Sequence, residues 1–174
     1  MNAALKTKLQ KIKLLVMDVD GVLTDGRIVV DAQGKELKFF DVHDGFGLVL
    51  LRQAGIKTAI LSARSSPAVT ARAEDLKIDK IYQDAYPKTS AYERLIRELN
   101  CRDEQVCFMG DDLPDLPVLK RVGLAVAVSN AAGELKKIAD HVTTRRGGAG
   151  AVREVVELIL NAQGKWRNIV AQMG

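Results

Sequence analysis

Aspartates gather at two places where an apolar stretch of this sequence ends. LLVMDVDG carries Asp18 and Asp20, and QVCFMGDD ends in Asp111 and Asp112. Like charges held together raise one another's proton affinity unless a cation lies among them. Carboxylate oxygens are the ligands that Mg²⁺ prefers, and a bound Mg²⁺ often takes a substrate phosphate as well. We therefore predict a magnesium site whose candidate ligands are Asp18, Asp20, Asp111 and Asp112.

Two other segments supply groups that bind phosphoryl oxygens. Ser62 follows the apolar stretch KTAIL, and Lys88 opens a segment of helical periodicity. A hydroxyl and an ammonium group beside a carboxylate–metal cluster suit phosphoryl transfer. One aspartate of the first pair can attack phosphorus and form an aspartyl-phosphate. The other can donate a proton to the leaving alcohol and later accept one from water. The pattern predicts a phosphate monoester hydrolase.

Each motif, taken alone, also has an ordinary structural interpretation. Asp-x-Asp-Gly is a common turn sequence, because an Asp side chain accepts hydrogen bonds from nearby backbone N–H groups. GDD is common in loops, and Asp115 either caps the helix that follows it or orients Lys88. The joint order of DxDG, a strand followed by Ser, a Lys and then GDDxxD favours the catalytic interpretation.

Strand-type and helix-type segments alternate along the chain and must position these groups. The expected strands are 13–19, 57–61, 80–83, 105–110, 124–128 and 141–144, and the expected helices are 44–55, 65–76, 87–100, 115–122, 130–139 and 151–163. This alternation predicts an α/β fold, a doubly wound and mostly parallel sheet with helices on both faces. Ligands bind beyond the carboxyl ends of the strands in such folds, where Asp18, Ser62 and Asp111 would lie.

We expect residues 1–174 to form a single domain. RIVV and KELKFF flank the turn DAQG and predict a β-hairpin at about 27–40, and a tail occupies about 162–174. The gaps between the motifs leave no room for a lid domain, so the hairpin or the tail could pack against a neighbouring copy and cover its site. GGAG (147–150) is expected to be a flexible joint before the last long helix.

The composition excludes several classes of protein. The hydrophobic content of 47% argues against disorder, and no apolar run is long enough to cross a bilayer. The first residues lack the apolar stretch of a secretory signal, so a cytoplasmic location with Cys101 and Cys107 reduced is expected. The net charge of +4 comes from bases interleaved with acids, and aromatic residues are few, so no nucleic-acid or membrane partner is predicted.

The sequence DVDGVLTDG, LSAR, Lys88 and GDDLPDLPVL, in that order, resembles the haloacid-dehalogenase superfamily of phosphatases, over roughly residues 12–167. The resemblance implies that Asp18 is the nucleophile and Asp20 the general acid and base. It also implies that Ser62 and Lys88 hold the phosphate. The implied ligands of Mg²⁺ are Asp18, the backbone carbonyl of Asp20, and Asp111, with Asp112 in support.

A narrower resemblance is carried by ELKFFDVHDGFGL and RRGGAGAVREVVELILNAQGKW. These segments look like a branch of the superfamily that releases phosphate from an eight-carbon keto-sugar acid on the route to lipopolysaccharide, and whose members are homotetramers. The branch usually carries Asn or His in place of Asp41, Arg in place of His43, and Thr-Gly-Arg in place of Ser62-Ala63-Arg64. These departures leave a nine-carbon keto-sugar phosphate, or another sugar phosphate, as an alternative substrate.

Four residues are candidates for binding the sugar acid itself: Asp41, His43, Arg64 and Arg72. Guanidinium groups match planar carboxylates, whereas Arg72 could instead lie on a solvated helix face and His43 in a subunit interface. Two functions of another class stay open. A phosphoaccepting receiver domain would place its acidic pair after the first strand and its acceptor after the third, an order not found here. A non-catalytic scaffold would lose Asp20 or Lys88, and both are present.

Overall fold

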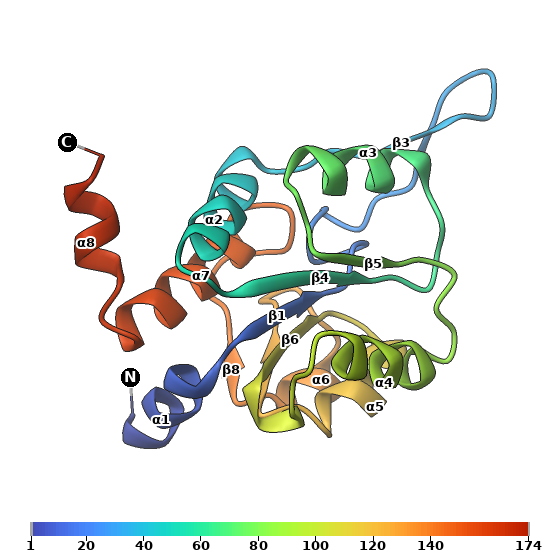
Figure 1. The fold of residues 1–174 in the computed structure, drawn as a ribbon. Helices are drawn as coiled ribbons and strands as arrows, with labels where there is room; N and C mark the ends of the chain where they lie inside the picture. The colour runs from blue at the N-terminus through green and yellow to red at the C-terminus, as the bar shows by residue number, and fades with distance from the viewer. Residues whose placement is uncertain (1, 174) are drawn as a thin grey trace.

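A six-stranded parallel sheet forms the centre of the molecule (Figure 1). In the computed structural model, which describes residues 2–173, the strand order is β5-β4-β1-β6-β7-β8. The strands are β1 (Leu14–Met17), β4 (Lys57–Leu61), β5 (Lys80–Tyr82), β6 (Val106–Gly110), β7 (Leu124–Ala127) and β8 (His141–Val142). The four inner strands are buried almost throughout, as the apolar runs of a parallel sheet with both faces covered must be.

Helices cover both faces of the sheet, as the alternating pattern predicts (Figure 1). On one face α2 packs against α7, with α3 beside them, and α4, α5 and α6 lie on the other. The bounds are α2 (Val42–Gln53), α3 (Pro67–Asp75), α4 (Lys88–Glu98), α5 (Leu116–Leu119), α6 (Gly133–Ile138) and α7 (Ala151–Ala162). Two short 3₁₀ turns are η1 (Asp103–Gln105) and η2 (Leu113–Asp115).

Two helices lie outside the predicted set. α1 (Ala3–Lys11) precedes β1, and α8 (Trp166–Ala171) follows α7 at the side of the molecule away from the hairpin (Figure 1). α1 buries Leu9 alone, and no residue of α8 is fully buried. The sequence signal was weak for this reason, since a helix is recognised by an apolar stripe that recurs every three or four residues.

The predicted hairpin is present as β2 (Val29–Val30) and β3 (Glu36–Leu37), which pair antiparallel and stand apart from the main sheet.

The observed ends of the helices differ from the predicted ones by a few residues. α2 begins at Val42 because Asp41 caps it, accepting hydrogen bonds from the N–H groups of His43 and Asp44 at 2.7 and 3.1 Å. Among the described residues, no helix combines the length and the apolar character needed to cross a bilayer.

The glycine-rich segment 147–150 differs from its prediction as a flexible joint. Gly147 and Gly150 are buried, and the Gly148 N–H donates a hydrogen bond to the Val22 carbonyl at 2.9 Å. A Cβ at Gly147 would overlap the carbonyl oxygen of Gly21. The glycines here allow two stretches of backbone to touch, which is the other common reason for glycine in a loop.

Candidate active site

The sheet topology brings the two aspartate motifs together. In the sheet, β4 and β5 lie on one side of β1, and β6, β7 and β8 lie on the other. The order in which strands are added therefore reverses between β1 and β6, which are neighbours. The pairing of Met17 with Met109 sets the register, and Asp18 and Asp111 follow at the carboxyl ends of these strands. A switch point of this kind leaves a crevice beyond the strands, where ligands bind in open α/β sheets.

Lys88 lies between two carboxylates at the first residue of α4. Its Nζ is 2.8 Å from Asp18 Oδ1 and 2.6 Å from Asp115 Oδ1, and its side chain is only 2% exposed. Burial lowers the pKa of Lys88, but the attraction of Asp18 and Asp115 outweighs it and the pKa is raised. Lys88 is thus a fixed positive charge at the pocket floor.

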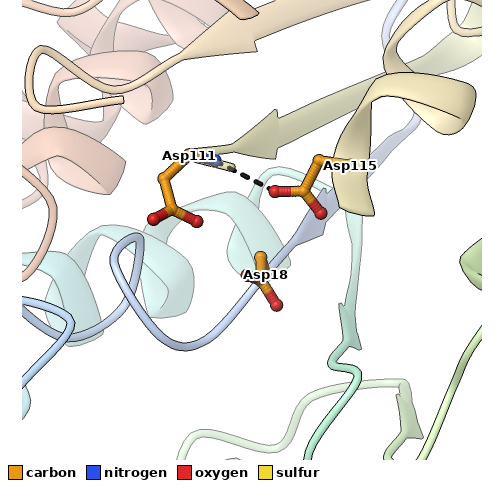
Figure 2. A group of neighbouring side chains, drawn as sticks. All are labelled: Asp18, Asp111 and Asp115. Atoms are coloured by element: carbon orange, nitrogen blue, oxygen red, sulfur yellow. Dashed lines mark hydrogen bonds between the residues drawn. The ribbon is translucent and has the colours of Figure 1, made fainter. Parts of the chain in front are cut away.

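Three carboxylates face one another across this floor (Figure 2). Asp18, Asp111 and Asp115 each offer an oxygen, and these oxygens lie within 4.8 Å of one another. Burial raises the pKa of Asp18 to about 6, although Lys88 opposes the rise. Burial and the charges of Asp18 and Asp115 raise the pKa of Asp111 to about 8. Such raised pKa values indicate that the negative charges of these carboxylates are not fully compensated by nearby positive groups. A bound divalent cation would compensate them.

Asp112, a predicted ligand of Mg²⁺, and Asp115 lie in different environments. Asp112 is exposed, and its carboxylate accepts a hydrogen bond from the N–H of Leu113 at 2.8 Å. Asp115 is buried, and its Oδ2 accepts a hydrogen bond from the N–H of Asp111 at 3.0 Å (Figure 2). Of the two roles considered for Asp115, the contact with Lys88 is the one that the structure shows.

Ser62 lies at the end of β4, where the sequence predicts it. It is 3% exposed, its N–H donates to the Tyr82 carbonyl, and its Oγ accepts a hydrogen bond from the N–H of Arg64 at 3.3 Å. A hydroxyl held in this way keeps its own proton free to donate to a ligand oxygen.

Asp20 is paired with side chains from the hairpin and from the loop after β4. Its carboxylate contacts the Lys38 ammonium and lies 3.6 Å from Arg64 Nε. Glu36 joins the same group, with 2.6 Å to both Lys38 Nζ and Arg64 Nη2. The hairpin is therefore tied to the rim of the pocket by alternating charges.

Lys38 and Glu36 were missed by the sequence analysis. A signal was available, because residues two apart on a strand point to the same face, and the charged residues Glu36 and Lys38 are so spaced in the predicted strand segment KELKFF. That signal says that the two side chains share a face, but it does not say what they face.

A pocket of about 290 Å³ opens above this floor. Its lining includes Asp18, Asp20, Ser62, Arg64, Lys88, Asp111, Asp112 and Asp115. Three of the predicted sugar-acid residues lie outside that lining. Asp41 caps α2, the side chain of His43 is 75% exposed, and Arg72 packs against Gly45 of α2 and pairs with Asp75 at 2.6 Å. Arg64 is the one member of that set that lines the pocket.

The chain is similar in sequence to known hydrolases. The haloacid dehalogenase-like hydrolase family model matches residues 78–155. The chain is 47% identical to 3-deoxy-D-manno-octulosonate 8-phosphate phosphatase of Yersinia pestis over 88% of this chain and 82% of that protein. It is 44% identical to the enzyme of the same name from Escherichia coli K12, over 94% of this chain and 87% of that protein.

The fold is also similar to that of solved structures. The phosphatase of the same name from Moraxella catarrhalis, crystallised with magnesium, phosphate and a KDO molecule, superposes with a TM-score of 0.95 at 41% identity, covering 98% of each chain. The sequence identity, the coverage and the shared fold lead to one conclusion. The chain belongs to the haloacid dehalogenase-like hydrolases and, within them, to the family of 3-deoxy-D-manno-octulosonate 8-phosphate phosphatases.

Proposed function

We propose that this protein is a magnesium-dependent phosphatase that releases phosphate from 3-deoxy-D-manno-octulosonate 8-phosphate, a step in lipopolysaccharide sugar synthesis. The observation that carries the proposal is the pocket floor, where a buried lysine lies between Asp18 and Asp115 beside a third carboxylate, Asp111. The relatives of this chain carry that activity in their names and cover most of its length.

The reaction begins at Asp18 in this proposal. A carboxylate oxygen of Asp18 attacks phosphorus, the bond between phosphorus and the sugar oxygen breaks, and Asp20 gives that oxygen a proton. A water molecule then loses a proton to Asp20 and attacks the aspartyl-phosphate, which releases phosphate and restores Asp18. Lys88 and Ser62 bind the phosphoryl oxygens throughout, because a fixed ammonium group and a hydroxyl line the pocket beside Asp18.

Asp18 and Asp111 would hold the magnesium ion, with the Asp20 carbonyl as a further ligand. The residues present fit such an ion, since three carboxylate oxygens lie within 4.8 Å of one another and the pKa values of Asp18 and Asp111 are raised. When bound, magnesium shields the negative charge of the incoming phosphate from the attacking carboxylate.

A screen of phosphorylated sugars and sugar acids tests the substrate. We expect the largest kcat/KM with the eight-carbon keto-sugar acid 8-phosphate, an intermediate value with a nine-carbon keto-sugar acid 9-phosphate, and low values with simple sugar phosphates. EDTA should abolish turnover and Mg²⁺ restore it. A higher kcat/KM for the nine-carbon compound would replace the proposed substrate. A single turnover of phosphate without further release would favour a receiver-like module.

We also propose that the protein is a homotetramer in which the hairpin meets a second copy. The apolar side chains of the hairpin face outwards, with Ile28, Val30 and Phe39 exposed by 52%, 54% and 68%. Side chains of this kind on a protein surface favour burial against a partner. Phe39→Glu should lower the mass measured by sedimentation velocity, whereas Ile138→Glu on α6 should not. A native mass equal to one chain would refute the tetramer.

A cytoplasmic location and a single phosphatase domain complete the proposal. Cys101 and Cys107 are free thiols, as expected in a reducing compartment. One cluster of buried apolar residues runs from Leu9 to Ala162, which supports one folding unit over this range.

A further inference from the structure

Asp44 is a buried carboxylate that does not line the pocket. It lies in the first turn of α2 and is 1% exposed. Its Oδ1 accepts a hydrogen bond from the N–H of Arg153 at 2.7 Å, and its Oδ2 accepts one from the N–H of Gly150 at 3.2 Å. These donors belong to the start of α7, more than 100 residues later in the chain. Burial is the main reason that the pKa of Asp44 is raised to about 6.

The segment that Asp44 holds lies directly on the turn after Asp20. The N–H of Gly148 donates to the carbonyl of Val22 at 2.9 Å. A Cβ on Gly147 would overlap the carbonyl of Gly21, and one on Gly148 would overlap the backbone of Thr24 and Asp25. No side chain separates the two stretches of backbone, so a shift of residues 147–150 has to move residues 21–25.

The same turn touches the metal side of the pocket. A Cβ on Gly21 would overlap the carboxylate of Asp111, so the backbone of Gly21 packs directly on that side chain. Two further hydrogen bonds lie in the glycine-rich segment or next to it. Asn130 accepts from the N–H of Gly147 at 2.8 Å, and Glu154 accepts from the N–H of Arg145 at 3.0 Å.

We propose that Asp44 is a positioning residue: by fixing the start of α7 it presses residues 147–150 against residues 21–25 and so sets the place of Asp20 in the pocket. The inference rests on the proposed function, in which Asp20 protonates the leaving oxygen. It extends that function to a side chain of α2 that lies outside the pocket lining.

The test uses the different needs of two leaving groups. The leaving oxygen of a sugar phosphate requires a proton, whereas p-nitrophenolate leaves without one. With Asp44→Asn, one acceptor is replaced by an NH₂ group that cannot bind a backbone N–H. We expect kcat/KM for the sugar phosphate to fall by about tenfold or more, and that for p-nitrophenyl phosphate to change by less than about threefold.

Asp20→Asn is the reference, and Asp140→Asn is the matched control. The Asp140 carboxylate also accepts from a backbone N–H, that of Ala125 at 2.9 Å, but it contacts no residue of the pocket lining. This variant should lower the melting temperature and leave both kcat/KM values unchanged. Gly148→Ala disturbs the contact between residues 147–150 and residues 21–25 directly. If Asp44→Asn fails to fold, Gly148→Ala should show the same selective loss of kcat/KM for the sugar phosphate.

The outcomes separate the two proposals. If Asp20→Asn lowers both kcat/KM values equally, the role of Asp20 is wrong and the inference falls with it. If Asp20→Asn is selective but Asp44→Asn and Gly148→Ala lower both values equally, or neither, the positioning role alone is refuted. Hydrogen exchange of residues 19–26 should also quicken in Asp44→Asn, and unchanged exchange there would contradict the inference.

Discussion

Asp18 is the proposed nucleophile, and its carboxylate lies close to those of Asp111 and Asp115. Replacing it with Asn keeps the size of the side chain and removes one of three neighbouring negative charges. We expect phosphate release by Asp18→Asn to fall by at least about a thousandfold, because an amide oxygen cannot form the covalent intermediate. The melting temperature without Mg²⁺ should stay within a few degrees of the native value, since the lost pair with Lys88 is offset by the relief of repulsion.

The control for Asp18→Asn is Asp31→Asn at the tip of the hairpin. The Asp31 side chain accepts hydrogen bonds from the N–H groups of Gln33 and Lys35, and an amide oxygen can replace it there. Phosphate release measured at saturating substrate should match that of the native protein. Near-native turnover by Asp18→Asn would show that the nucleophile lies elsewhere.

Asp115 and Asp112 lie three residues apart and differ sharply in environment. Asp115 is buried against Lys88, whereas Asp112 is exposed and caps η2. Removing one partner of a buried pair costs more than removing a cap, roughly 3 kcal/mol against about 1 kcal/mol. We expect Asp115→Asn to lower the free energy of unfolding and the affinity for Mg²⁺ more than Asp112→Asn does. Denaturant titration and calorimetry measure both, and the reverse order would refute this prediction.

At the scale of the elements, the hairpin depends on side-chain contacts for its attachment to the pocket rim. β2 and β3 pair over two residues each, and a hairpin of this size is marginal by itself. Glu36 ties it to Arg64 in the loop after β4 and also pairs with Lys38 within the hairpin. In Glu36→Gln we expect amide exchange of residues 29–37 to quicken by about threefold to fivefold, as the loss of up to about 1 kcal/mol implies.

Exchange of β1 and β6 should be unchanged in Glu36→Gln, because those strands are held by the sheet ladder. Glu134→Gln on α6 is the control for the loss of a surface charge, and it should leave the hairpin unaffected. Native exchange rates at residues 29–37 in Glu36→Gln would show that the hairpin is held by other contacts.

For the whole molecule, the acidic group makes stability depend on pH. The pKa values of Asp18 and Asp111 are raised from 3.8 to about 6 and about 8, and that of Asp44 to about 6. Between pH 4 and pH 8 the folded protein therefore holds protons that the unfolded chain has released. The free energy of unfolding must then fall as the pH rises through this window.

We expect the melting temperature in EDTA to fall between pH 5 and pH 8, and saturating Mg²⁺ to reduce or reverse this fall. Asp111→Asn should flatten the profile in EDTA, because it removes the group with the highest of the three pKa values. Differential scanning fluorimetry over this range provides the measurement. A melting temperature in EDTA that rises with pH would contradict the raised pKa values of Asp18, Asp44 and Asp111.

Much of the fold and half of the site could be predicted from the sequence because the rules involved are local. Apolar runs that alternate with helical periodicity require a covered parallel sheet, and the residue after each strand lies at its carboxyl end. These rules predicted that Asp18, Ser62 and Asp111 lie near one another, and all three line the pocket in the structure. The register of β1 on β6 then decided which of their atoms meet.

The remaining features depend on contacts between residues distant in sequence, which no local pattern contains. Only the tertiary structure could decide between the two roles considered for Asp115, by placing it against Lys88, or bring Glu36 and Lys38 to Asp20. It also turned GGAG from an expected joint into a close backbone contact. Sequence by itself determined which chemical groups stand at the ends of which elements. The packing of those elements decided their partners, because burial, ion pairing and steric fit arise only when segments far apart in the chain meet.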